Sequence, residues 1–285
     1  MAAFINTNIA SLNAQRNLNT SQASLATSLQ RLSSGMRINS AKDDAAGLAI
    51  ADRMTSSIRG NTVAMRNAND GISMAQTAEG SLSKVGDNLQ RMRELAVQSA
   101  NGTNTAEDRT ALNTEFAELQ KEVTRVVAAT KYNGVDILGS AGTSLKFQVG
   151  AGTTAATDQI EVTGKDMTAA ATSDVAKSTV AGTVKIDGAD GSEALKAITA
   201  IDKALTEVNT QRTVYGAVQN RFESVVSNLQ VSVESQSASR SRIMDADFAS
   251  ETANLTRGQI LQQAGTAMLA QANSLPNGVL SLLRG

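Results

Sequence analysis

The sequence contains no cysteine and no histidine. Without cysteine there can be no disulfide bond and no thiolate metal site, although the absence fits a reducing compartment as well as an oxidising one. Without histidine there can be no Ser-His or Cys-His nucleophile and no HExxH metalloprotease site. These nucleophile and metal sites are excluded by composition, and we expect no catalytic residue, no metal site and no cofactor.

Aromatic residues and proline are also scarce. Aromatics make up 2% of the chain, with no tryptophan, and the 285 residues include one proline. A thick core packed from aromatic rings is not expected. Long uninterrupted helices are allowed, because proline is the residue that most strongly breaks them.

Neither net charge nor hydropathy points to a nucleic acid or a membrane. The 26 basic and 27 acidic residues give a net charge of −1, and no stretch approaches the roughly 18 apolar residues of a membrane helix. Residues 1–10 are neutral and rich in Asn and Thr, unlike a cleaved signal peptide. We expect a protein that is soluble when made and that, if exported, uses a route independent of such a peptide.

Apolar residues spaced alternately three and four apart are the strongest positive signal. This spacing places them along one line of a helix, here called a seam, as in coiled coils. Three such runs, at 75–96, 112–126 and 215–236, predict a mainly α fold with a long coiled-coil helical bundle. The seam residues we expect to be buried are Leu82, Val85, Leu89, Met92, Phe116, Leu119, Phe222 and Leu229.

Turn and capping signals separate these helices. Asn101-Gly102 is typical of a helix end, and Thr105 with Asp108 predicts a capping box, so the helices on either side should form a hairpin. Ser40 with Asp43 is a weaker start signal for a helix from about residue 43 to 100.

The middle of the chain differs in character. Alternation over 145–149, 159–163 and 182–186 predicts strands in a small β-hairpin region. Residues 150–155 match the dinucleotide motif GxGxxA, but a strand follows where that motif needs a helix, so a hairpin loop is favoured. Asp187 and Asp190 lack the spacing of a calcium loop, which favours a solvated turn.

Both ends of the chain predict amphipathic helices whose apolar faces are too large to leave in water. Residues 1–40 contain three arginines and no acid. The ends could pair with each other as a coiled coil, or they could in addition be buried against other subunits. The residues assigned to such an interface are Ile5, Leu12, Leu25, Leu29, Leu32, Ile260, Leu261, Leu269, Leu280 and Leu283.

Long ordered blocks at both ends resemble the bacterial flagellins, the subunits of the flagellar filament. The blocks are INTNIASLN at 5–13, LSSGMRINSAKDDAAGLAI at 32–50, LQRMRELAVQSAN at 89–101, SRIMDADFASET at 241–252, QILQQAGT at 259–266 and VLSLLR at 279–284. With the helical stretches between them, they cover about residues 1–140 and 190–285.

The resemblance implies an inner domain in which the two terminal helices pair as a coiled coil, and an outer helical domain. On this basis 1–40 and 241–285 form the inner domain, 41–140 and 191–240 the outer helices, and 141–190 a short variable β-hairpin region. Short spokes near 37–44 and 238–246 join the domains, and the extra surface domains of larger relatives are reduced or missing.

The resemblance also implies partners and a location. The expected partners are other copies of the chain in a helical homopolymer, a flagellin export chaperone, the flagellar cap and the hook-associated junction proteins. The chain should be secreted through the flagellum's own export apparatus. A vertebrate toll-like receptor should bind the free monomer through Arg91, Leu95 and Glu115.

The function implied is therefore that of a structural filament subunit and not of an enzyme. Two alternatives remain open at this point. One is a hook-filament junction protein of the same architecture, which usually has a larger middle region. The other is a filament subunit with an enzymatic insert, such as a metalloprotease, for which the histidine ligands are missing.

Overall fold

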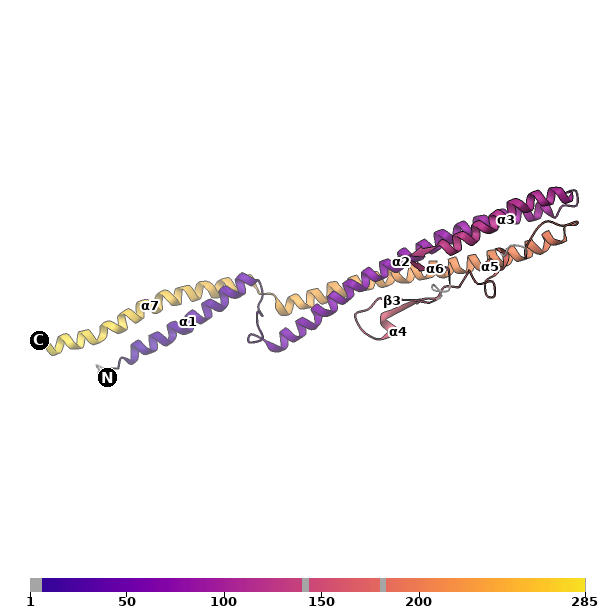
Figure 1. Ribbon diagram of the computed structural model, residues 1–285. Helices are drawn as coiled ribbons and strands as arrows, with labels where there is room; N and C mark the ends of the chain where they lie inside the picture. The colour runs from indigo at the N-terminus through magenta and orange to yellow at the C-terminus, as the bar shows by residue number, and fades with distance from the viewer. Residues whose placement is uncertain (1–6, 140–143, 180–182, 285) are drawn as a thin grey trace. The chain divides into compact units, whose positions relative to one another are not determined.

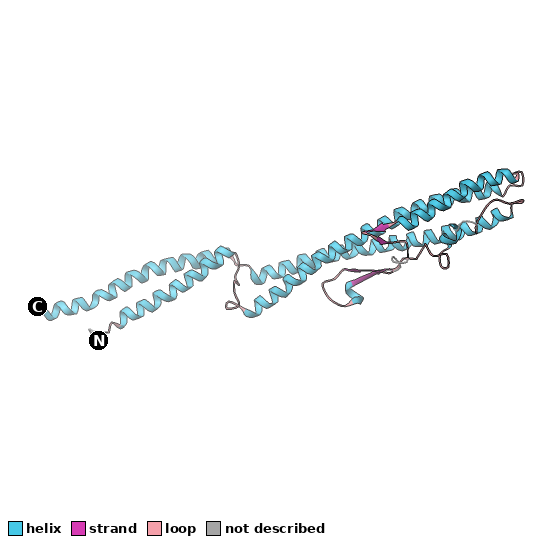
Figure 2. Cartoon of the chain, viewed as in Figure 1, coloured by secondary structure: helices cyan, strands magenta, loops and turns pink. Residues whose placement is uncertain are grey.

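The structure is a computed structural model that describes residues 7–139, 144–179 and 183–284. Helices dominate it, as Figures 1 and 2 show, and the mainly α fold predicted from the sequence is confirmed. The chain divides into two compact units. Unit 1 comprises residues 1–56 and 235–285, and unit 2 comprises residues 57–234. The division falls within two long helices, α2 (Ala45–Ser99) and α6 (Ser192–Met244).

Unit 1 is built mainly from α1 (Ile9–Ser34) and α7 (Phe248–Arg284). The side chain of Asn8 caps the start of α1, and Gly35 ends it in the left-handed conformation at φ 70°. Residues beyond each helix meet in a backbone bridge between Met36 and Asp245. Beside this bridge lies a small apolar cluster of Ile38, Ala51 and Met244.

The long helix expected from about residue 43 to 100 is present as α2, and the segment before it sets its first residue. Asp43 Oδ2 accepts hydrogen bonds from the backbone N–H and the hydroxyl of Ser40, but these close a separate turn. The helix begins at Ala45, and Asp44 Oδ1 accepts the N–H of Gly47 as a capping residue does. Two adjacent aspartates thus cap two successive turns. The sequence analysis identified Asp43 but not Asp44.

Unit 2 is a bundle of α2, α3 (Ala106–Ala129) and α6. The expected capping box of Thr105 and Asp108 opens α3, so the predicted helical hairpin is confirmed. Leu119 and Leu229 are half-buried, and the other six predicted seam residues are fully buried. Those six are Leu82, Val85, Leu89, Met92, Phe116 and Phe222.

The ring of one phenylalanine in unit 2 lies against both a second ring and a glycine. The ring of Phe222 on α6 meets Phe147 edge to face, with 5.4 Å between centroids. A Cβ added at Gly71 on α2 would lie 2.6 Å from the Phe222 ring, closer than carbon atoms can pack. The glycine therefore makes room for the ring.

Two small antiparallel hairpins complete the regular structure. In the first, β1 (Lys131–Tyr132) pairs with β2 (Val135–Asp136) across Asn133 and Gly134, both at positive φ. An Asn-Gly pair is the usual signal for such a turn, and our sequence analysis did not use it. The second hairpin pairs β3 (Leu145–Gln148) with β4 (Gln159–Val162), as predicted.

The β3–β4 loop explains the GxGxxA match. It contains α4 (Ala155–Asp158), a single turn, and the Asp158 carboxylate accepts the N–H of Thr154. The same carboxylate fills the space where side chains at Gly150 and Gly152 would lie. These glycines therefore leave room for an aspartate within the loop, and the hairpin-loop interpretation is confirmed.

The strand predicted at 182–186 is wrong for the described residues 183–186. This segment bonds to helix side chains and not to a neighbouring strand. Gln120 donates to the carbonyl of Val184, while Ile186 donates its N–H to Asn113 and accepts from the Ser99 hydroxyl. Alternation of side chains therefore could not identify what the backbone of this segment would bond to.

Candidate assembly surface

The helices α1 and α7 run antiparallel and pair along a heptad seam. Three contacts fix the register: Asn8 donates to the carbonyl of Ala272 at 2.7 Å, the Ser11 hydroxyl bonds Asn273, and Arg31 lies 4.0 Å from Glu251. The expectation that the terminal helices pair is confirmed. The positions withdrawn from solvent on the two helices are Ser11, Ala14, Leu18, Ser21, Leu25, Ser28, Arg31 and Leu32, and Glu251, Leu255, Gly258, Gln262, Gly265, Leu269 and Ala272.

Small residues let this seam close tightly. A Cβ at Gly258 would lie 3.1 Å from a methyl group of Leu25, and one at Gly265 would lie 3.1 Å from a methyl group of Leu18. Both glycines and both leucines are seven residues apart, so each pair repeats after one heptad. Serines, alanines and a glutamine occupy many of the remaining seam positions. The large apolar side chains of the seam are five leucines: Leu18, Leu25, Leu32, Leu255 and Leu269.

The residues assigned to an interface from the sequence fall into three groups. Leu25, Leu32 and Leu269 are half-buried in the seam. Leu12, Leu29, Ile260 and Leu261 lie outside the seam and are 48–60% exposed. Ile5 lies outside the described residues, and Leu280 and Leu283 belong to the end of α7, where the backbone alone is described.

Three further large apolar side chains are exposed on the same helices. Ile9, Phe248 and Met268 are each 63–65% exposed, more than any interface residue selected from the sequence. On α7, Ile260, Leu261, Ala264 and Met268 follow helical spacing and define an exposed face outside the seam; we call it the outer face of α7. The spacing could have revealed this face, but without the partner helix it could not be told from the seam.

The residues assigned to a receptor site have different surroundings. Arg91 on α2 is exposed and donates to Glu115 on α3 at 2.8 Å and to Glu94 at 3.0 Å. The hydrogen bonds that Arg91 donates to Glu115 and Glu94 raise its pKa. Leu95 is 1% exposed and belongs to the core of unit 2, so the expectation that the receptor contacts Leu95 is corrected: the folded monomer does not present this side chain.

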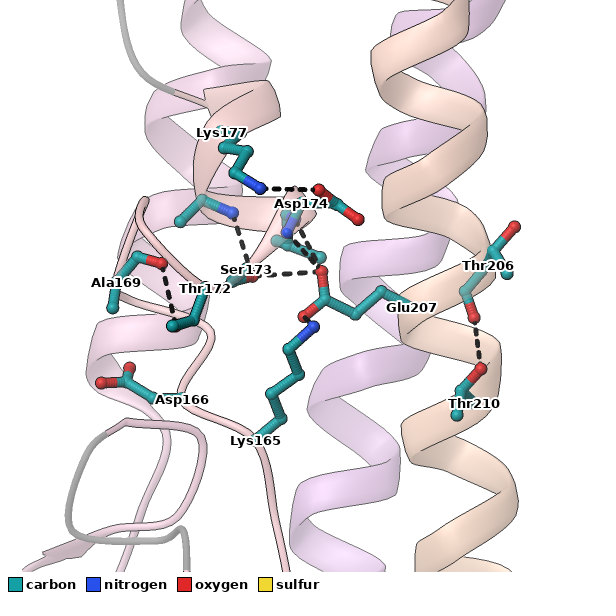
Figure 3. Close-up of polar contacts among 12 residues, drawn as sticks. Lys165, Asp166, Ala169, Thr172, Ser173, Asp174, Lys177, Thr206, Glu207 and Thr210 are labelled. Atoms are coloured by element: carbon teal, nitrogen blue, oxygen red, sulfur yellow. Dashed lines mark hydrogen bonds and ion pairs between the residues drawn. The ribbon is translucent and has the colours of Figure 1, made fainter.

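The segment between β4 and α6 is held by buried polar side chains (Figure 3). One carboxylate oxygen of Glu207, on α6, accepts the backbone N–H groups of Asp174 and Val175 and the hydroxyl of Ser173. These groups begin the short helix α5 (Asp174–Thr179). The other oxygen lies 2.8 Å from the ammonium of Lys165, an ion pair that lacks the alignment of a hydrogen bond.

Arg109 anchors the far end of that segment. Its guanidinium is buried and donates to the carbonyls of Ser99, Asn101 and Ala189. Nearby Asp190 accepts from the N–H and hydroxyl of Ser192, and this hydroxyl bond lowers the pKa of Asp190. Asp187 pairs with Lys185 at 3.4 Å. The two aspartates therefore have local structural partners.

Within the described ranges, no group of three or more acidic side chains is placed to hold a metal ion. No helix of the same ranges is long and apolar enough to cross a membrane. The feature that stands out is thus the exposed apolar surface of α1 and α7.

Comparison with known proteins agrees with this emphasis on the two ends. Residues 5–144 match the model of the bacterial flagellin N-terminal helical region, and residues 198–283 match that of the C-terminal helical region. The chain is 45% identical to a flagellin of Xenorhabdus nematophila over 313 aligned positions, covering all of both chains. It is 44% identical to a flagellin of Halalkalibacterium halodurans, covering 99% of this chain and 100% of the relative.

A solved structure shares the fold. A putative flagellar hook-associated protein from Vibrio parahaemolyticus aligns with a TM-score of 0.60, covering 71% of this chain and 100% of that one. The identity is 14%, so the likeness concerns the architecture alone.

Proposed function

The chain belongs to the bacterial flagellin family, the non-enzymatic subunits of the extracellular flagellar filament, and from this premise we propose that the exposed apolar residues of α1 and α7 form the contacts between subunits. The observation that carries the proposal is that these side chains lie outside the seam that already pairs the two helices. The residues are Ile9, Leu12, Leu29, Phe248, Ile260, Leu261 and Met268.

Removal of this surface from water supplies a driving force for assembly. Burying one large apolar side chain is worth about 1.5–3 kcal/mol, and several lie on each subunit. The seam within one subunit leaves these side chains uncovered, so their burial has to come from another molecule. Repeated contacts that do not close on themselves generate a helical filament, the homopolymer that the family forms.

The test replaces residues on the outer face of α7. Ile260→Ser combined with Leu261→Ser should abolish growth from filament seeds or raise the critical concentration by at least tenfold. Leu195→Ser is the matched control, because Leu195 is 60% exposed but lies in unit 2. Growth of the double variant at the wild-type rate, with α7 still helical by circular dichroism, would contradict the proposal.

We also propose that the apolar end of α7 is held by an export chaperone before assembly. The support is the run of apolar residues in VLSLLR at 279–284, which is costly to leave in water. Leu280→Asp with Leu283→Asp should weaken chaperone binding in calorimetry and also reduce filament growth. Unchanged affinity would move the chaperone site elsewhere. The flagellar cap and the hook-associated junction proteins are proposed partners on the basis of the family alone.

The receptor is a further proposed partner of the free monomer, with Arg91 and Glu115 at the centre of the contact. Both are exposed, and arginine often dominates interfaces. Arg91→Ala should lower monomer signalling in a receptor reporter assay more than tenfold. The matched control is Arg125→Ala, because Arg125 is also exposed and pairs with Glu122 on a helix surface. If the Arg91→Ala and Arg125→Ala monomers signalled equally well, Arg91 would not belong to the receptor site.

The two alternatives are less well supported. Both regional models of flagellin match, and full-length flagellins are 44–45% identical, whereas the hook-associated likeness is at the level of the fold. An enzymatic insert of the metalloprotease kind lacks its histidines.

A further inference from the structure

One methionine differs from the others in its exposure. Met74, Met92 and Met167 are at most 2% exposed and Met244 is 9% exposed, while Met36, Met54 and Met65 are half-buried. Met268, on α7, is 64% exposed. Among the described methionines it is the one whose sulfur-bearing side chain lies largely in solvent.

The position of Met268 gives this exposure a consequence. It belongs to the outer face of α7 with Ile260 and Leu261, which are 60% and 48% exposed. A thioether packs well in such apolar surroundings because it is flexible and only weakly polar. In the filament, this side chain would move from water into a contact between subunits.

We propose that Met268 is an oxidation site through which peroxide-type oxidants control assembly. The inference rests on the proposed assembly role of the outer face of α7. The sulfur lone pair attacks one oxygen of hydrogen peroxide, the O–O bond breaks, an S–O bond forms and water leaves. Sulfur loses two electrons and the peroxide gains them, so no further reactant is required.

Oxidation of Met268 makes the outer face of α7 more polar and therefore harder to bury against an apolar surface. A sulfoxide is polar and is a strong hydrogen-bond acceptor, so placing it among apolar side chains costs free energy unless a donor is supplied. Monomers modified at Met268 should therefore enter the filament poorly. Subunits already assembled should be protected, because the neighbouring subunit covers the sulfur.

The first experiment measures protection directly. Monomer and filament are treated with dilute hydrogen peroxide, and sulfoxide at each methionine is quantified by peptide mass spectrometry. Met268 should react at least tenfold faster in the monomer than in the filament. Met74 and Met92 serve as internal references, because both are fully buried in the monomer and should react slowly in both samples.

The second experiment measures the effect on growth. Peroxide-treated wild-type monomer should show a critical concentration for seeded growth at least tenfold higher than untreated monomer. Treatment with a methionine sulfoxide reductase should restore growth. Met268→Leu cannot be oxidised at this position and should grow normally after the same treatment, even if half-buried methionines react. Untreated Met268→Gln should grow as poorly as the oxidised wild type.

These outcomes distinguish the oxidation proposal from the assembly proposal on which it rests. Equal oxidation of Met268 in monomer and filament would contradict the placement of the outer face of α7 between subunits. Protection of Met268 in the filament, with normal growth of oxidised monomer, would overturn the oxidation control alone. A growth defect that persists in treated Met268→Leu would assign the effect to another methionine.

Discussion

At the scale of single residues, heptad spacing predicted burial in unit 2 because each helix presents a line of apolar residues to its neighbours. The same spacing did not predict the burial of Leu95, which lies one position before the seam residue Ala96. The helix α2 has a partner on two sides: Arg91 pairs with Glu115 on α3, and Arg93 pairs with Asp202 on α6. A helix between two others buries a wider strip than a single seam.

Leu89 offers a direct test of the unit 2 seam. It is fully buried, so Leu89→Ala should leave a cavity and lower the free energy of unfolding by about 2–5 kcal/mol. Leu195→Ala, at an exposed position, should change it by less than about 0.5 kcal/mol. Chemical denaturation followed by circular dichroism measures both. Similar values for the two variants would remove Leu89 from the core.

Gly71 offers the opposite test, in which an atom is added. Gly71→Ala should destabilise the protein by about 1–3 kcal/mol, since the new Cβ collides with the Phe222 ring. Gly80→Ala on the same helix meets open space and should stabilise the protein by up to about 1 kcal/mol through helix propensity. The melting temperatures should therefore move in opposite directions. A rise for both would mean that the ring moves aside without cost.

At the scale of elements, a local signal such as the capping box of α3 was predicted correctly, whereas hydrogen bonds between residues distant in sequence were not predicted. The capping box of α3 spans four residues, Thr105 to Asp108, so its chemistry is visible in the sequence. The Gln120–Val184 and Glu207–Asp174 hydrogen bonds join residues 64 and 33 positions apart. A strand-like pattern gives no information about such partners, and the strand predicted at 182–186 was wrong for this reason.

The capping box predicts a pH dependence. Hydrogen bonds from the backbone N–H and hydroxyl of Thr105 lower the pKa of Asp108. A carboxyl whose folded-state pKa is lowered stabilises the protein above its unfolded pKa, about 3.9, and this contribution is lost as pH falls through the folded value. Wild type should therefore melt above Asp108→Ala at pH 6, and the difference should shrink below about pH 4. A constant difference would mean that the charge is irrelevant.

Thr105→Ala tests the other half of the same box. Loss of the cap should cost about 0.5–2 kcal/mol of stability, measured by denaturation at pH 6. Thr110→Ala is the matched control, because the Thr110 hydroxyl bonds its own helix at Ala106 and caps nothing. If both variants lost the same stability, the loss would come from removing any helical threonine side chain and not from removing the cap.

At the scale of the whole molecule, the pairing of the two ends followed from their amphipathic patterns. Those patterns did not predict which leucines of the two ends lie in the seam and which are exposed. Leu25 and Leu29 are both leucines on one helix, and Leu25 is drawn into the seam by the space opposite it at Gly258. That space comes from the other end of the chain and cannot be read from α1 alone.

Removing residues 1–40 and 245–285 should separate folding from assembly. Unit 2 has its own core, so the fragment should remain helical and melt cooperatively. It should not grow on filament seeds, because α1 and α7 are gone. Light scattering and calorimetry measure the two properties. Growth of the fragment would place the essential contacts in unit 2.

The hydroxyl groups of α1 and α7 bear on the cost of removing these helices from water. Thr20, Ser21 and Thr27 each donate to the carbonyl four residues earlier, as do Thr252 and Thr256. A hydroxyl has a single proton to donate, and here it is already used within its own helix. A neighbouring molecule that covers these positions therefore leaves no donor of theirs stranded, and the dehydration penalty of packing against a hydroxyl-rich helix is correspondingly low.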